Sequence, residues 1–162
     1  MEYVTHPLAP IVSVHSTTLL LGTMPSPVSR LRGFYYAHPQ NRFWPVLAAV
    51  YGVPVPETNE ERTRLVLDHG LALWDVLASC EIVGASDASI RNPVPNAIAA
   101  LCERAPIARV LTTGLTAYRL YCRYVEPTTG LAATALPSPS AANARMSLAE
   151  LTARYRAALL PE

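Results

Sequence analysis

The segment GTMPSPVSRLRGFYYAHPQNRFW, residues 22–44, follows directly on the apolar run TLLL at residues 18–21. This run predicts a short buried strand over residues 16–21, which Gly22 ends. The segment after it shows no clear helical or strand period, yet it combines Gly, Pro, Ser, Tyr, His, Asn, Arg and Trp. Long ordered loops in compact domains tend to carry function, so this loop is the first candidate for a site.

The rest of the chain alternates between helical and strand patterns. Helices are predicted at residues 43–51, 60–69, 97–105 (capped by Asn96), 115–125 and from a Ser147–Glu150 capping box onward. Strands are predicted at residues 71–77, 108–113 and 132–136, whereas residues 1–15 are expected to form a peripheral arm. Strands that alternate with helices predict an α/β domain with a mostly parallel sheet.

Three irregular segments are expected to meet at one edge of this sheet. Residues 22–44 and 137–145 directly follow predicted strands, and residues 79–96, also expected to be irregular, follow the strand at 71–77. Ligands of parallel α/β sheets bind beyond the carboxyl ends of the strands. The order of the elements therefore places a binding site where these loops converge.

Composition sets limits on the class of protein. The 162 residues are 51% hydrophobic and 15% charged, with a net charge of +1, which predicts one globular domain over residues 1–162. All 13 cationic side chains are Arg. Without Lys, no side-chain amine is present to form a Schiff base. The N-terminus has no secretory pattern and no apolar run reaches membrane-spanning length, so we expect a soluble, cytoplasmic monomer without a membrane partner.

Several familiar chemistries lack their sequence motifs. The three cysteines are widely spaced without a CxxC pair, and the four histidines form no HExxH pattern, so no metal site is expected. No Gly-rich nucleotide fingerprint and no GxSxG elbow is present. The carboxylates in candidate loops are Asp75, Glu81 and Asp87, and nothing in the pattern selects a catalytic pair among them. Asp75 lies in an apolar segment, so it is either a paired structural carboxylate or a site residue, and we prefer the structural interpretation.

The loops instead offer aromatic, amide and guanidinium groups. Tyr35 and Tyr36 can stack on a flat ring, and Asn41 can bind a base edge or position a water. Both types also have simpler interpretations, since tyrosines often pack in cores and loop amides often cap turns. Arginines of the loops, Arg42 and Arg145 among them, can contact phosphates. Together these groups favour an enzyme that takes a base out of the DNA stack.

Four elements in this order are similar to motifs of a known family. GTMPS, YYAHPQNRFW, LWDVLASC and LPSPSAANA resemble the uracil-DNA glycosylase superfamily, and within it the hypoxanthine-DNA (deoxyinosine) glycosylase branch. The resemblance extends from Leu19 to about Ala144. It implies a three-layer α/β/α sandwich with a short four-stranded sheet, and a base-excision repair enzyme that flips a deaminated base and hydrolyses its N-glycosidic bond. It implies no metal and no cofactor.

The resemblance also assigns roles to individual residues. Met24 stands where most of the superfamily has a water-activating Asp or Asn, and the hypoxanthine branch gives that role to the residue at Asn41. Tyr36 matches the aromatic residue that stacks on the flipped base. The implied base-binding residues are Gly22, Thr23, Met24, Pro25 and Tyr36. The implied leaving-group or DNA-backbone contacts are Ser138, Ser140, Ala142, Asn143 and Arg145. Ala142, at the position of a bulky wedge in related enzymes, is small.

Two alternatives to a deoxyinosine glycosylase stay open. The same fold can act on uracil, xanthine or a mismatched thymine, in single- or double-stranded DNA. A non-catalytic module that binds a damaged base is favoured by Met24 and opposed by Asn41. For an enzyme, the absence of Lys predicts a monofunctional glycosylase with no Schiff-base lyase step.

Overall fold

A parallel sheet forms the centre of the computed structural model, which describes residues 1–161; Glu162, the last residue of the predicted domain, lies outside the described residues. Its strands follow the order β3–β2–β6–β7, and every neighbouring pair is parallel. The strands are β2 (Thr18–Gly22), β3 (Leu71–Asp75), β6 (Arg109–Thr113) and β7 (Ala133–Leu136). The predicted α/β class and the parallel sheet are confirmed.

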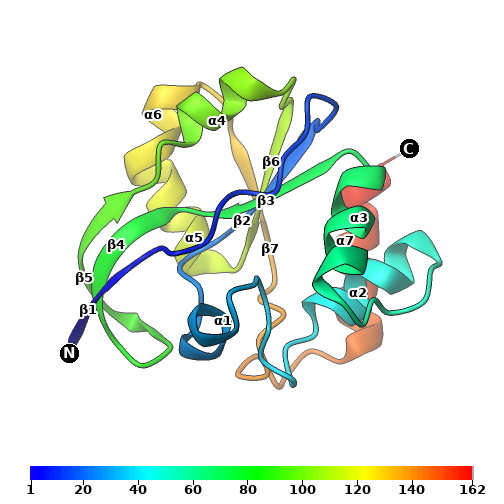
Figure 1. Ribbon diagram of the computed structural model, residues 1–162, viewed down its shortest axis with the longest axis horizontal. Coiled ribbons are helices and arrows are strands. Elements are labelled where there is room, and N and C mark those ends of the chain that lie inside the picture. Colours follow the sequence, from blue (N-terminus) through cyan, green and yellow to red (C-terminus); the bar gives the residue numbers. More distant parts are fainter. Residues whose placement is uncertain (162) are drawn as a thin grey trace.

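Helices cover both faces of this sheet (Figure 1). One layer holds α2 (Phe43–Tyr51), α3 (Asn59–Asp68) and α7 (Leu148–Leu159). The opposite layer holds α4 (Ile98–Arg104), α5 (Leu115–Leu120), a π-helical turn at Tyr121–Val125 and α6 (Glu126–Thr129). The predicted three-layer α/β/α sandwich is therefore confirmed.

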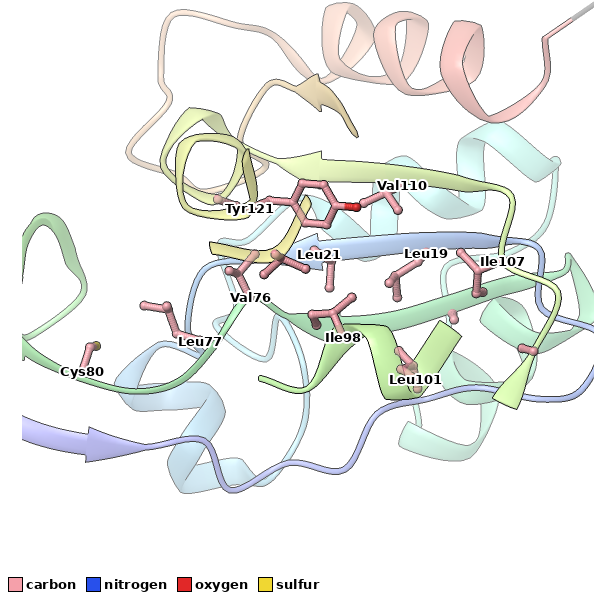
Figure 2. Close-up of a cluster of buried hydrophobic side chains, with 14 of the residues drawn as sticks. Leu19, Leu21, Val76, Leu77, Cys80, Ile98, Leu101, Ile107, Val110 and Tyr121 are labelled. Atoms are coloured by element: carbon pink, nitrogen blue, oxygen red, sulfur yellow. The ribbon is translucent and has the colours of Figure 1, made fainter. Parts of the chain in front are cut away.

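Strand β2 is buried along its whole length because it lies in the middle of the sheet. Successive side chains of a strand point to opposite faces. Leu19 and Leu21 accordingly pack in the cluster shown in Figure 2, where Ile98 of α4 and Tyr121 meet them. Leu20 packs on the other face with α2, α3 and α7. The continuous leucine run is thus the sequence pattern of a central parallel strand.

Helix ends follow local sequence signals. The Ser147 hydroxyl accepts a hydrogen bond from the Glu150 N–H at 3.1 Å and caps α7, as the capping box predicts. The first loop also contains a short helix that its lack of periodicity did not predict, α1 (Pro27–Arg32). Ser26 caps this helix and Gly33 ends it at a φ of 72°, a left-handed conformation that glycine adopts without steric cost.

The segment 79–96 is not irregular, and the prediction for it was wrong. Strands β4 (Leu77–Val83) and β5 (Ser86–Pro95) form an antiparallel hairpin. Strand β1 (Glu2–Thr5) pairs with β4 in the same second sheet. Prolines and a bulge at Asn92 made β5 resemble a loop, but β5 is an edge strand, where missing N–H donors and register shifts are tolerated.

Two further expectations for the sequence around this sheet need correction. Asn96 does not cap α4; its Nδ2 donates to the carbonyls of Asp75 and Leu77, and α4 begins without a side-chain cap. The N-terminal arm is not merely peripheral, because Ile11 bridges Leu73 at the edge of the parallel sheet. This arm also carries His6 into the interior, which matters for the site below.

Candidate active site

A pocket of about 570 Å³ opens at the carboxyl edge of the parallel sheet. Each of the four strands contributes a residue at or just beyond its end: Gly22 from β2, Asp75 from β3, Thr113 from β6 and Ser138 after β7. The register pairs Gly22 with Asp75, so these two residues are neighbours on adjacent strands. The predicted convergence of loops at this edge is confirmed by the lining of the pocket.

Gly22 forms part of the pocket floor because no larger residue fits there. A Cβ atom at this position would lie 2.4 Å from Asp75 Oδ1 and 3.0 Å from the Tyr36 hydroxyl. It would also lie 3.4 Å from Thr113 Oγ1. The absence of a side chain therefore leaves three oxygen atoms facing a common space. The requirement for glycine comes from this close approach and not from its backbone angles, since its φ is not among the positive ones.

Two contacts hold the Tyr36 side chain in the pocket wall. Its ring stacks on Phe43, with centroids 4.0 Å apart and planes at 12°, and its hydroxyl hydrogen-bonds the Thr113 hydroxyl at 2.8 Å. Its backbone has a φ of 52°, an unfavourable left-handed conformation for a bulky residue. Burial, followed by the negative charge of Asp75, raises the pKa of Tyr36, so the phenol stays protonated. Because Phe43 covers one ring face, the other is available to a ligand.

Asn41 caps a turn with its side chain and also lines the pocket. Its Oδ1 accepts a hydrogen bond from the Phe43 N–H at 2.9 Å, which fixes the amide at the start of α2. The same residue lines the pocket. A carbonyl oxygen has a second lone pair and the amide has two N–H donors, so the side chain can still bind a water or ligand. His38 is exposed and accepts a bond from the Gln40 N–H, consistent with a structural role.

Arg42 fixes the loop that follows β7. Its guanidinium donates to the carbonyls of Ser140, Asn143 and Met146, and its backbone N–H donates to Pro139 O at 3.0 Å. The hypothesis that Arg42 contacts phosphate does not fit this geometry, since its donors point into the protein. Charge-assisted bonds of this kind are stronger than neutral ones. Arg42 therefore joins the first loop to the third.

The third loop forms the opposite wall of the pocket with its own hydrogen bonds. Ser138 Oγ accepts from the Ser140 N–H at 3.2 Å, which leaves its hydroxyl proton free for another acceptor. Asn143 Nδ2 donates to Ser138 O at 3.0 Å. Ala142 lies exposed at the pocket rim. Arg145 is exposed as well and does not line the pocket.

The structure thus brings most of the predicted site residues together. Those that line one pocket are Gly22, Thr23, Met24, Pro25, Tyr36, Asn41, Ser138, Ser140, Ala142 and Asn143. Met24 also packs against the hydrophobic cluster below the sheet. Arg145 is the one member of the predicted set outside the lining.

Two carboxylates also line this pocket. Asp87, on the β4–β5 hairpin, accepts a hydrogen bond from the Thr23 hydroxyl at 3.3 Å. Partial desolvation raises the pKa of Asp87, the bond from Thr23 opposes this rise, and the charge of Asp75 adds to it. Ser89 instead serves the turn, accepting from the Val83 N–H. The sequence left the roles of the hairpin residues open.

Asp75 is held by a residue that sequence analysis did not select. His6 Nε2 lies 2.8 Å from Asp75 Oδ2, and both side chains are almost fully buried, with 3% and 6% exposure. The Leu8 N–H donates to His6 Nδ1 at 3.2 Å, so the ring proton lies on Nε2 and points to the carboxylate. A histidine directly before Pro7 in an expected peripheral arm carried no signal of this contact. Thr113, which ends a strand just before Gly114, was also missed.

Comparison with known proteins identifies the family. The sequence profile of the uracil DNA glycosylase superfamily matches residues 9–160, nearly the whole chain. The chain belongs to this superfamily. It is accordingly a DNA glycosylase, a hydrolase that acts on N-glycosyl bonds in DNA.

Two similar proteins are named hypoxanthine DNA glycosylase. The one from Methanosarcina barkeri is 30% identical over 98 residues, which cover 60% of this chain and 62% of that protein. The one from Methanosarcina acetivorans is 29% identical over 141 residues, which cover 85% and 87%. A solution NMR structure of a Methanosarcina acetivorans protein, proposed in its name to be a uracil DNA glycosylase, superposes with a TM-score of 0.80. That match has 25% identity and covers 98% of this chain and 99% of the other.

Neither a metal cluster nor a membrane span emerges from the described residues. Among residues 1–161, no group of three or more His, Cys, Asp and Glu side chains is placed to hold a metal ion. No helix in this part of the chain has both the length and the apolar character that a membrane span requires.

Arg42→Lys should lower the stability of the fold and weaken DNA binding, although it keeps the positive charge. Lysine can replace one of the three guanidinium bonds, and each lost charge-assisted bond costs about 1.5–3 kcal/mol. With two such bonds lost, we expect the free energy of unfolding, measured with urea, to fall by about 3–6 kcal/mol. Arg32→Lys, at an exposed arginine with one carbonyl bond, is the matched control and should change it little. Equal losses of stability in both variants would contradict the role of Arg42 in joining the first loop to the third.

Asp87→Asn should make thermal stability depend less on pH. A carboxyl with a raised folded-state pKa favours the folded state below its unfolded pKa, and this contribution is lost as pH rises through the folded pKa. The neutral amide avoids that loss, so the variant should have a slightly higher Tm than the wild type at pH 7, and the gain should be small because Asp87 is exposed to solvent. The difference should vanish below about pH 4. Glu103→Gln, an exposed position on α4, should show no such trend in the same Tm series.

Proposed function

We propose that the protein removes a deaminated base, hypoxanthine in deoxyinosine, from DNA by hydrolysis and leaves an abasic site. The observation that carries the proposal is the pairing of Tyr36 and Asn41 in one pocket. The free face of Tyr36 is suited to stack on a flipped base, and the Asn41 amide is suited to place a water beside the sugar. A base that is stacked in a duplex cannot also stack on the Tyr36 ring, so the proposal includes flipping of the base out of the duplex.

The reaction breaks the bond between C1′ and N9 of the nucleotide. The bonding electrons leave with the purine, the sugar takes on oxocarbenium character, and a water oxygen attacks C1′. Asn41 is a very weak base, so it orients this water while the water's surplus proton passes to solvent or to the departing base. The bond from the Phe43 N–H fixes the amide in advance, which lowers the entropic cost of the attack. Met24, whose thioether cannot polarise water, contributes packing only.

The departing purine needs hydrogen-bond donors to disperse its charge. The backbone N–H groups of Thr23 and Met24 donate to no other group within residues 1–161, and both residues line the pocket. They are suited to bind the O6 edge in the manner of an oxyanion hole. The Ser138 hydroxyl, whose proton is free, is a second donor on the opposite wall. Hypoxanthine leaves as an anion more readily than adenine and pairs more weakly, which lowers the cost of flipping.

The choice of hypoxanthine is supported by the names of two relatives with about 30% identity. Uracil, xanthine and mismatched thymine present a similar carbonyl and N–H edge and form the nearest alternative. A binding module without catalysis is disfavoured because Asn41 lines the pocket where a water would be needed. The chain has no Lys, so we propose a monofunctional glycosylase without a Schiff-base lyase step.

The substrate is tested with duplexes that each carry one modified base. Separate duplexes contain hypoxanthine, uracil, xanthine or a G·T mismatch, and alkaline treatment converts each abasic site to a strand break. We expect the fastest cleavage with hypoxanthine. Scission with uracil alone would overturn the deoxyinosine assignment. Binding of the duplexes without any scission would establish the binding module instead.

Asn41→Ala should reduce the single-turnover rate on the preferred duplex by about 10²–10⁴-fold, because the water loses its positioning group. Alanine also removes the bond to the Phe43 N–H, so loss of folding must be separated from loss of chemistry. Asn41→Ser serves this purpose, since a serine hydroxyl can cap the helix but is too short to replace the amide. The serine variant should retain the wild-type Tm and still lose the rate.

Met24→Ala is the second comparison for the same assay. It should lower the rate far less than Asn41→Ala, because only packing is removed. Similar losses in the two variants would refute the assignment of water positioning to Asn41.

A further inference from the structure

One oxygen of the Asp75 carboxylate accepts no hydrogen bond from the described part of the chain, residues 1–161. The residue is 4% exposed and Oδ2 is occupied by His6 Nε2 at 2.8 Å. Within residues 1–161, no group donates a hydrogen bond to Oδ1, although the side chain is nearly buried and lines the pocket. Oδ1 is not among the fully buried atoms without a partner, so it is accessible from the pocket, and a group in the pocket has to supply its hydrogen bond.

A structural role explains Oδ2 but not Oδ1. The bond between His6 and Asp75 ties the N-terminal arm to the end of β3, and one oxygen is enough for this purpose. At Oδ1, the missing side chain of Gly22 keeps the space open, since a Cβ there would lie 2.4 Å from this atom. The hydroxyl of Tyr36 borders the same space but donates or accepts within its pair with Thr113. An acceptor that no group within residues 1–161 uses therefore faces the place where a base would stack on Tyr36.

We propose that Asp75 Oδ1 accepts the ring N–H of the flipped base and that Asp75 thereby selects a lactam edge over adenine. This inference rests on the proposed function, because it assumes that the pocket takes a base. A carboxylate is an acceptor only, and hypoxanthine offers N1–H beside the carbonyl O6. Adenine has a lone pair at N1, which would face the carboxylate without a hydrogen. His6 acts as the positioning residue, since it holds the carboxylate through Oδ2 and leaves Oδ1 toward the pocket.

The size of the selection follows from the cost of unpaired polar groups. Sites built to bind an N–H or O–H reject analogues that lack it much more strongly than apolar pockets reject a missing methylene. One bond to a charged acceptor corresponds to a factor of about 10–100 in affinity. Negative charge accumulates on the base as it departs, which opposes a nearby carboxylate. Asp75 should therefore act on binding and selection more than on the chemical step.

Binding to uncleavable duplexes tests the proposal independently of activity. A 2′-fluoro sugar suppresses cleavage by destabilising the oxocarbenium-like state, and an abasic analogue opposite the test base removes differences in pairing. Fluorescence anisotropy then gives the Kd for hypoxanthine and for adenine. We expect the wild type to prefer hypoxanthine by about tenfold or more. In Asp75→Asn, the amide can turn an N–H toward adenine N1, so this preference should fall by about tenfold.

Asp87→Asn is the matched control, because it removes a carboxylate from the same pocket without changing Asp75 Oδ1. Loss of a negative charge should strengthen binding to both duplexes alike, so the ratio of the two Kd values should stay that of the wild type. The proposal is overturned if the wild type shows no preference, or if folded Asp75→Asn keeps the full preference. A Tm measurement establishes folding in each variant.

A second pair of bases keeps the test decisive if Asp75→Asn does not fold. Purine and 1-deazapurine both lack a substituent at C6 and differ only in a lone pair or a C–H at position 1. The wild type should bind the 1-deazapurine duplex more tightly, because the carboxylate repels the lone pair. Equal binding would overturn the proposal. Cleavage is measured in a separate experiment with ordinary deoxyribose duplexes. Absence of scission there would refute the proposed function without deciding the role of Asp75.

Discussion

The pocket depends on one arginine that joins two loops almost a hundred residues apart in the chain. Arg42 uses its planar guanidinium to bind three carbonyls of the loop after β7, while its own backbone N–H binds a fourth. Arg42 also precedes α2, whose first residue Phe43 supports the Tyr36 ring. A single side chain therefore sets the distance between the aromatic wall and the wall that carries Ser138. Lysine, with one point of attachment, cannot fix a loop in this way.

A second constraint comes from the ends of the parallel strands. Gly22 and Asp75 are register partners, so the carboxylate comes close to the glycine backbone. The parallel sheet brings these groups together without any long-range charge pairing, because adjacent strands end at the same edge. The hydrogen bonds of this carboxylate then have to come from outside the sheet, and His6 supplies the one to Oδ2. The other oxygen, Oδ1, faces the pocket, which links the architecture of the sheet to the base recognition that we propose.

The sequence predicted those parts of the fold that local physics determines. The leucines of β2 form a continuous apolar run because a central parallel strand is buried on both faces. The cap at Ser147 and the start of α2 also follow from neighbouring residues. Strand β5 could not be predicted, because its prolines and the bulge at Asn92 are tolerated only at a sheet edge, and edge position is a property of the assembled sheet.

The candidate site likewise contains residues that the sequence predicted and residues that it did not. Tyr36 and Asn41 were selected because they stand in a loop with a specific motif, and the structure places both on the pocket wall. His6 was not selected, since its partner lies 69 positions away and nothing around it differs from an ordinary arm. Arg42 was considered for phosphate contact because guanidinium groups in loops commonly serve that purpose. Its true partners are carbonyls of a distant loop, which become visible only when the chain is folded.

In the mechanism that we propose, Met24 and the water-positioning group lie at opposite ends of the same loop. Met24 packs partly against the hydrophobic cluster below the sheet, so an apolar side chain there adds to the core that supports the pocket floor. The Asn41 amide, to which we assign water positioning, lies at the other end of the loop, where the Phe43 N–H fixes it at the start of α2. An amide held at a helix start is more rigid than one on a free loop, and rigidity is what a weak base needs in order to orient a water. The same turn carries Phe43, on which Tyr36 stacks, so the two groups that we propose for base stacking and water positioning depend on one structural element. A shift of α2 would therefore displace the Tyr36 ring and the Asn41 amide together.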